Sequence, residues 1–255
     1  NNFGCAVVFE ESGGTWTEAA TLNGSLAVEG NEHMGTSVAV SRDGSVIAVG
    51  APMDEASGFT NSGLVYVFVR SGSAWNDMSS ETTRLNPSDR ADADSFGTSV
   101  AVNADGSVIA TGAPGANGNG SNEGSAYVFL RPGEGWDAEP VYEEAARLRM
   151  SAAGGCDNSS LGESIEISTD GTIVAVGAPV YVRSLSSSGA VFVFAEPAGG
   201  WDDSYPTPTE VNETAILTTE TEYSSGLLGW DIAMTGDGSV IADRKSTRLN
   251  SSHRT

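Results

Sequence analysis

Two short apolar runs on either side of an Asp-Gly dipeptide recur along this chain. The first copy reads GTSVAVSRDGSVIAVGAP, where Val38–Val40 and Val46–Val49 flank Asp43-Gly44. Asp-Gly readily adopts the positive φ angles of a tight hairpin turn, so the copy predicts two antiparallel strands. Both runs are rich in β-branched residues and are nearly continuous instead of alternating. This pattern predicts strands that are covered on both faces.

The phrase returns in the same order at 97–114 and 162–179, and a fourth copy opens at Gly229 and breaks off after Ala242. The anchoring glycines are 62, 65 and 67 residues apart. Self-similarity at a nearly fixed period indicates a repeat architecture, in which each copy forms one structural unit.

Each copy is followed by a third apolar run, a tryptophan and a fourth run. The third runs are Gly63–Phe68, Gly124–Phe129 and Gly189–Phe194. The fourth runs are Thr83–Leu85, Ala145–Leu148 and Thr214–Leu217. Four antiparallel strands in about 60 residues, repeated along the chain, are typical of β-propeller blades. The fold class predicted is all-β, with four-stranded antiparallel blades, and Gly4–Phe9 begins a half blade.

A tryptophan stands seven positions after the last Phe of each third run. The four are Trp16, Trp75, Trp136 and Trp201. Such a set could stack on sugars, but its fixed distance from a strand end favours packing between blades.

The residues Phe96-Gly97 and Gly112-Ala113-Pro114, with SVAV between them and GSAYVF after them, resemble FG-GAP repeats. These repeats build the β-propeller of integrin α-subunits and of many secreted or surface proteins. The resemblance extends over Gly4–Ala242, although only Phe96 supplies the Phe of the FG pair. It implies a propeller that usually closes at seven blades, of which this chain holds about four blade equivalents. We expect these to form an open arc whose terminal half blades do not pair.

The last residues, Asp243–Thr255, break the repeat and contain Lys245, the only lysine of the chain. This segment resembles the translation of a sequencing adapter, and the alternative is a natural basic tail. We therefore expect a propeller region at 1–242 and a tail at 243–255 that does not belong to the fold. The chain carries a net charge of −22, which disfavours binding to nucleic acid or anionic membranes.

The sequence contains no apolar stretch near the ~20 residues of a membrane span, so no membrane insertion is expected, and no leader is evident. Two cysteines, Cys5 and Cys156, are too few for a disulfide framework. Sequons for N-glycosylation occur in or near expected loops and mildly support export. Their asparagines are Asn23, Asn119, Asn158 and Asn212.

The resemblance to FG-GAP repeats implies calcium as the candidate metal, because some FG-GAP blades bind it in an Asp-rich hairpin. Calcium requires six to eight oxygen ligands. Each turn here keeps a single Asp, at Asp43, Asp105, Asp170 and Asp237. We therefore predict turn formers and no metal or cofactor site. The acidic segment Asp89–Asp94 could bind a divalent ion weakly, but a solvated loop is the favoured interpretation.

No catalytic site is predicted. Outside the tail the only histidine is His33, and a G-x-S-x-G motif is missing. A carboxylate pair for glycoside hydrolysis is not excluded in so acidic a chain, but nothing marks one. The glycine-rich stretch Gly115–Gly124 lacks the following helix of a phosphate site, so it is interpreted as a flexible loop.

The segments that differ most among the copies are the loops between strands two and three and those between blades, which in such propellers share one face. They are Met53–Ser62, Pro87–Ser95, Gly115–Glu123, Ala152–Ser160 and Val180–Ser188. A constant scaffold with variable loops is typical of binding proteins. The function predicted is extracellular, non-catalytic recognition of a protein or glycan. The alternatives are an accessory region of a secreted hydrolase and a structural matrix protein.

Overall fold

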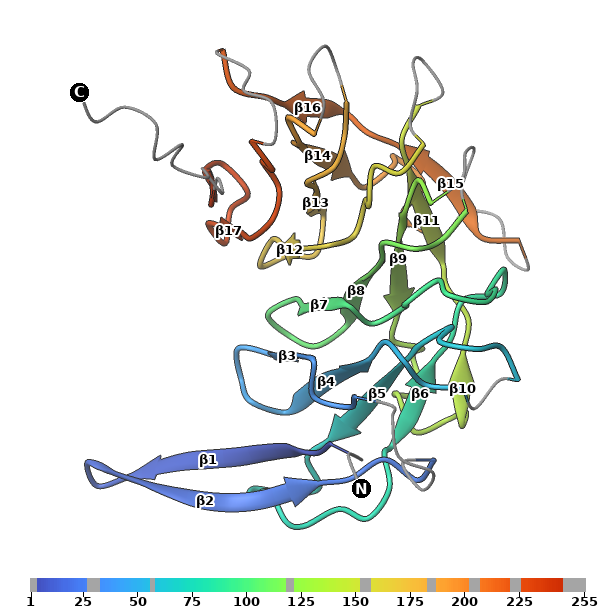
Figure 1. Cartoon of the computed structure of the whole chain (residues 1–255). Coiled ribbons are helices and arrows are strands. Elements are labelled where there is room, and N and C mark those ends of the chain that lie inside the picture. The colour runs from blue at the N-terminus through green and yellow to red at the C-terminus, as the bar shows by residue number, and fades with distance from the viewer. Residues whose placement is uncertain are drawn as a thin grey trace, which may run out of the picture.

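The structure, a computed structural model, is all-β and helix-free in the residues that it describes, which are 4–26, 33–55, 58–117, 122–151, 157–182, 187–201, 207–220 and 226–244. Five sheets follow one another along the chain and stack face to face in an arc (Figure 1). The all-β, propeller-like fold predicted from the repeats is therefore confirmed. No helix in this part of the chain is long and apolar enough to cross a membrane.

Three sheets are blades with the predicted four antiparallel strands, and we number them in chain order. Blade 1 contains β3 (Ser37–Val40), β4 (Val46–Ala51), β5 (Leu64–Val69) and β6 (Thr83–Leu85). Blade 2 contains β7 (Ser99–Val102), β8 (Val108–Ala113), β9 (Ser125–Leu130) and β11 (Ala146–Arg149). Blade 3 contains β12 (Ile165–Ile167), β13 (Ile173–Ala178), β14 (Ala190–Ala195) and β16 (Ala215–Leu217).

The two end sheets have two strands each. β1 (Ala6–Ser12) pairs with β2 (Thr15–Leu22), and β17 (Ile232–Met234) pairs with β18 (Ile241–Asp243). In the described residues no ladder joins these two sheets, in agreement with the open arc expected. β18 includes Asp243, and the Arg244 amide donates to Asp231, so strand pairing continues just past Ala242. The remainder of the tail, 245–255, lies outside the described residues.

Blades 1 and 2 gain a fifth, outermost strand that the repeat pattern does not predict. β10 (Val141–Tyr142) pairs in parallel with β6, and β15 (Thr209–Asn212) pairs in parallel with β11. Each fifth strand comes from the repeat that follows the blade it joins. In the same way, Met78 bridges Leu22 at the edge of the first sheet. The outer edge of each of these sheets therefore depends on the next repeat.

The core lies between successive sheets. Every residue of β4 and β8 is buried, as the continuous apolar runs predict. One cluster joins Val65 and Val67 of blade 1 to Tyr127 and Phe129 of blade 2. β3 departs from the expectation of two covered faces, because Val38 and Val40 are exposed where the two-stranded first sheet does not cover them.

The glycine before the last residue of the second strand of each blade allows the next blade to approach closely. A Cβ atom built on Gly112 would lie 2.0 Å from the carbonyl oxygen of Gly162, and one on Gly50 would lie equally close to that of Gly97. Beside this contact the Ser99 hydroxyl donates to the same Gly162 oxygen at 2.8 Å. The Gly-Ala-Pro motif and the anchoring glycine of the next copy thus form one inter-blade contact.

Candidate functional site

The described parts of the variable loops are held together in pairs, and we call the face that they form the loop face. The loop after β4 runs beside the linker from blade 1 to blade 2. The amides of Ser95 and Phe96 donate to the carbonyls of Asn61 and Ser62, at 3.1 and 2.9 Å. The same pairing recurs where the Leu161 amide donates to Glu123 at 3.0 Å. Adjacent blades therefore share each loop pair.

These loop pairs turn sharply because non-glycine residues adopt left-handed backbone conformations, which are uncommon for such residues. In the loops between strands two and three they are Asn61, Asn122 and Ser187, with φ of 52°, 49° and 52°. In the linkers between blades they are His33, Ser95, Ser160 and Leu227, with φ from 51° to 57°. Because the position is the same in each repeat, the corner belongs to the scaffold even though the sequence there varies.

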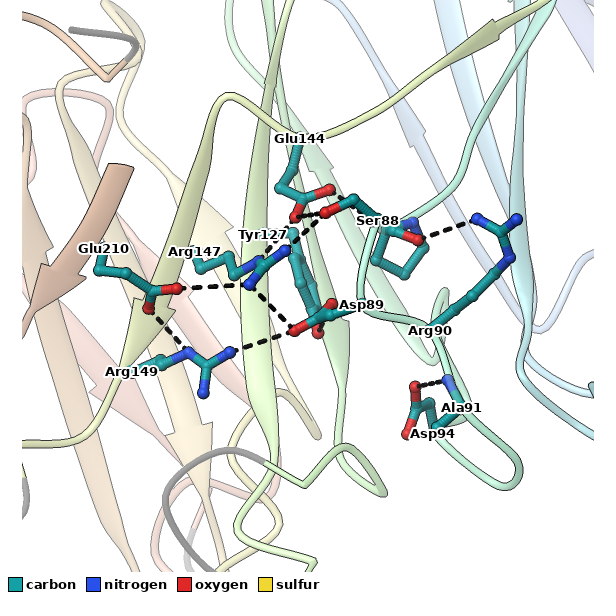
Figure 2. A network of polar contacts seen from close by, with 11 residues as sticks. Ser88, Asp89, Arg90, Ala91, Asp94, Tyr127, Glu144, Arg147, Arg149 and Glu210 are labelled. Carbon is teal, nitrogen blue, oxygen red and sulfur yellow. Dashed lines mark hydrogen bonds and ion pairs between the residues drawn. The ribbon is translucent and has the colours of Figure 1, made fainter. Parts of the chain in front are cut away.

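The linker Pro87–Ser95 is held further by a polar network that spans three repeats (Figure 2). Arg149 on β11 lies 3.1 Å from the Asp89 carboxylate and 2.8 Å from Glu210 of β15. Arg147 also contacts both acids, at 3.4 Å each. The buried Tyr127 hydroxyl donates to Asp89 at 3.1 Å, and burial together with the Asp89 charge raises the pKa of Tyr127.

The same network fixes the start of the linker. Glu144 accepts hydrogen bonds from the Ser88 amide and hydroxyl, at 2.8 and 3.0 Å, and from Arg147 Nε at 2.7 Å. Burial alone would lower the pKa of Arg147, but the bond to Glu144 and the nearby carboxylates raise it. Arg147 therefore remains a cation that neutralises part of this acidic cluster.

Asp94 at the far end of the linker is buried, with 2% of its surface exposed. Its Oδ2 accepts a 2.6 Å hydrogen bond from the Ala91 amide, and its Oδ1 has no hydrogen-bond partner among the described residues. Burial and the charges of Asp89 and Asp92 raise the pKa of Asp94 to about 6. The solvated loop predicted for Asp89–Asp94 is therefore wrong for Asp94, which is buried, whereas Asp89 is exposed and also ion-paired.

Two apolar side chains stand exposed in the loop after β4. Met53 is 41% exposed and Phe59 is 38% exposed. The guanidinium carbon of Arg90 lies 5.9 Å from the centre of the Phe59 ring, within cation–π range. The next residue, Thr60, donates its amide to Asp92 at 2.8 Å. A hydrogen bond therefore joins the loop that carries Phe59 to the linker that carries Arg90.

The four Asp-Gly turns lie on the opposite face, and their carboxylates stabilise the turns. Asp43 accepts hydrogen bonds from the Ser41 hydroxyl at 2.7 Å and from the Ser45 amide at 3.0 Å. These bonds lower the pKa of Asp43 to about 2. Asp105, Asp170 and Asp237 make equivalent contacts. In the described part of the chain, no three His, Cys, Asp or Glu side chains converge as metal ligands.

Three of the four tryptophans pack between sheets, as predicted. Trp75, Trp136 and Trp201 are buried in the clusters that join successive sheets. The Trp136 indole also donates to the Gly106 carbonyl of its own Asp-Gly turn at 2.8 Å. Trp16 differs, because it is 68% exposed on β2. The packing expectation is therefore wrong for Trp16.

The structure places the remaining residues that the sequence analysis singled out as follows. His33 is half-buried, and its backbone carbonyl accepts from the Thr36 hydroxyl at 2.7 Å. Cys5 is a free, exposed thiol, and Cys156 lies outside the described residues, as does Asn119. Within the described ranges His33 lies in no metal-ligand cluster.

Sequence reasoning missed a repeated contact between blades, which we call the glutamate latch. Glu81, Glu144 and Glu213 each precede a fourth strand, and each accepts from the amide and hydroxyl of a serine in the preceding repeat. The serines are Ser25, Ser88 and Ser151. The signal was present in the sequence as E-x-x-x-L-x-x-S at 81–88 and 144–151, spread over a strand and the following linker.

The family comparison agrees with this geometry. Residues 16–68 and 79–129 match the model of the FG-GAP repeat. The first match runs from β2 into β5, and the second runs from just before β6 into β9. Each match contains one Asp-Gly turn. No curated protein matches the chain. The third copy continues the same strand order and the same left-handed corners. Residues 16–68 and 79–129 of this chain therefore carry FG-GAP repeats, within an all-β, propeller-like fold.

Proposed function

We propose that the protein is an extracellular, non-catalytic recognition module that binds a protein or glycan with its loop face. The observation that carries the proposal is the pairing of variable loops on constant backbone corners. Recognition loops bind well when a rigid scaffold positions them, because less conformational entropy is lost on binding. The exposed Phe59 and Met53 and the half-buried Arg90 belong to residue types that are enriched at protein interfaces.

The alternative of an accessory region in a secreted hydrolase is favoured by no specific contact. In the described residues the carboxylates with the most distinctive environments have structural roles. Asp89 and Glu144 hold arginines and a linker, and Asp54 accepts from the buried Tyr66 hydroxyl at 2.8 Å. The proposal is therefore limited to binding.

The test compares variants of the two faces of the same chain. The probes are an array of defined oligosaccharides and an array of purified extracellular matrix proteins. Phe59→Ala combined with Met53→Ser should abolish binding to any target that the wild-type protein recognises. The matched control is Arg42→Ala on the turn face, which should retain binding.

Binding that survives the loop-face substitutions but is lost in the turn-face variant would contradict the proposal. Hydrolysis of an arrayed oligosaccharide or ester by the purified protein would instead support the hydrolase alternative. Circular dichroism of each variant excludes loss of folding as the cause of lost binding.

A further inference from the structure

Two asparagines in sequons lie on the outer rim of the arc, each at the end of an outer strand and beside the start of a linker of the loop face. Asn212 ends β15, the outermost strand of the blade 2 sheet, and Asn23 directly follows β2, the outer strand of the first sheet. Each follows a buried residue, Val211 or Leu22, and is itself exposed. Both asparagines are therefore accessible to solvent.

The local sequence and contacts at both positions are compatible with N-glycosylation. Asn23 is followed by Gly24 and Ser25, and Asn212 by Glu213 and Thr214. The carboxamide Nδ2 of Asn23 donates a long hydrogen bond, of 3.4 Å, to the Met78 carbonyl. A glycosylated asparagine keeps one N–H on Nδ2, so this contact can persist after modification.

The next repeat provides an internal contrast. Asn86 occupies the position of Asn23 after the fourth strand and is also followed by a serine two residues later. Asn86 is buried, with 8% of its surface exposed, and Pro87 at the middle position abolishes the sequon. The exposed asparagine carries a usable sequon, and the buried one does not.

The described sequon of the loop face is different. Asn158 has a left-handed backbone, with φ of 57°, and its Oδ1 accepts from Asn122 Nδ2 at 3.3 Å. Ser159, next to it, is fully buried. A glycan at this position would project over the paired loops that the proposed function requires to be accessible.

We propose that Asn23 and Asn212 carry N-linked glycans that cover the outer rim beside the loop face. The inference rests on the extracellular location in the proposed function. The donor is an oligosaccharyl pyrophosphate lipid. The bond from sugar C1 to the pyrophosphate oxygen breaks, a bond from C1 to Nδ2 forms, and Nδ2 loses one proton. The glycan at Asn212 shields the free edge of β15, which is otherwise open to pairing with another strand.

The test expresses the full chain behind a heterologous leader in a eukaryotic secretory host. Total and secreted pools are both analysed, so that retention in the cell does not conceal modification. Enzymatic release of N-glycans in ¹⁸O-water converts each modified asparagine to labelled aspartate, which peptide mass spectrometry then locates. Labelled residues are expected at positions 23 and 212. Asn23→Gln and Asn212→Gln should each lower the apparent mass on an electrophoretic gel by the increment of one glycan. Asn76→Gln, an exposed asparagine outside any sequon, is the control and should leave the apparent mass unchanged.

An unmodified asparagine at either rim position, or a glycan at Asn158 alone, would overturn the inference. Because the leader is supplied and binding is not measured, this result is independent of the loop-face experiment. A chain that binds through its loops but lacks rim glycans would refute only the present inference.

Discussion

Single residues in left-handed backbone conformations maintain the loop face, and several of them are poorly suited to that conformation. Ala93 has φ of 66° in the exposed linker between blades 1 and 2. An L-residue with a Cβ is disfavoured there by roughly 1–2 kcal/mol, and asparagine tolerates the region best among non-glycine residues. This strain is a local cost of a sharply folded, hydrogen-bonded linker.

Ala93→Asn should therefore increase the free energy of unfolding by about 0.5–1 kcal/mol, because it relieves strain without the added chain entropy of glycine. In a protein of this size we expect a rise of about 2–4 °C in Tm per kcal/mol. Thermal unfolding followed by circular dichroism provides the measurement. Ala91→Asn, two residues away and without a positive φ, is the matched control, and an equal gain there would contradict the explanation.

Asp94 makes stability depend on pH in a direction opposite to that of an ion-paired carboxylate. Its pKa in the folded protein is about 6, above the ordinary value of 3.8, because the group is buried near Asp89 and Asp92. Between about pH 4 and 6 the folded state therefore binds more protons than the unfolded state. The unfolding free energy is therefore highest, as far as Asp94 is concerned, below pH 4, where the group is protonated in both states. This contribution is lost as the pH rises through 6 and the buried carboxyl ionises.

Asp94→Asn should remove this dependence, since the amide oxygen can still accept from Ala91. At pH 7.5 we expect the variant to exceed the wild type by about 2–3 kcal/mol in unfolding free energy, and at pH 4 by almost nothing. Urea denaturation at the two pH values gives both differences. A constant difference at the two pH values would show that Asp94 does not titrate in this range.

At the residue level the sequence predicted chemistry best where the contacts are local. The Asp-Gly turns form as expected, because each Asp bonds to groups within two residues of itself. The role of Asp89 could not be predicted, since it depends on Arg147, Arg149 and Tyr127 in another blade. Sequence alone predicts that such an acidic segment is solvated, because the arginines that pair with Asp89 lie about 60 residues further along the chain.

At the level of elements, the glutamate latch connects the start of one fourth strand to the linker after the previous one. Glu144 is the most heavily bonded example, because it also holds Arg147, and its side chain is fully buried. Removing a buried carboxylate leaves its donors unsatisfied, which typically costs 1–3 kcal/mol and more for charged groups.

Glu144→Ala should therefore lower the unfolding free energy by about 2–4 kcal/mol, because it leaves the Ser88 amide and Arg147 Nε without the carboxylate that accepts from them. The neighbouring exposed residue provides the control, and Glu143→Ala should change stability by less than about 0.5 kcal/mol. Chemical denaturation measures both. A double-mutant cycle with Ser88→Ala should show coupling, and additivity of the two substitutions would mean that the latch does not act as a pair.

The order and pairing of the four main strands followed from the repeated apolar runs. The fifth strands did not, because β10 has two residues and β15 has four, and neither resembles the other in sequence. Their pairing is set by the partner edge in the preceding repeat, not by a periodicity of their own. The Asp-Gly turns before β4 and β8 and the burial of these two strands were predictable, because nearly the same residues recur in each copy of the repeat.

At the scale of the whole molecule, stability should behave as a sum of blades and of contacts between neighbours, as in other repeat arrays. Gly112 is a sensitive point in that sum, because a Cβ there would lie 2.0 Å from the Gly162 carbonyl oxygen. Backbone on both sides leaves little room for adjustment.

Gly112→Ala is thus expected to separate blade 2 from blade 3, and to divide one unfolding transition into two or broaden it markedly. Differential scanning calorimetry reports the change. Gly133→Ala, whose added Cβ would meet no atom within 4 Å, is the control and should leave a single transition. A single transition of unchanged width in Gly112→Ala would indicate that the blades are not coupled through this contact.

The parallel fifth strand has a consequence for how the protein is made. Val141 of β10 pairs with Arg84 of β6, so blade 1 waits for a strand that is synthesised 57 residues later. At translation rates of about 5–20 residues per second, the edge of β6 stays open for roughly 3–11 s after it leaves the ribosome. Blades 1 and 2 of the nascent chain thus each pass through an interval with an unprotected edge, and a chaperone would be needed during that interval. Slowing translation between β6 and β10 should lengthen that interval and increase aggregation without changing the finished protein.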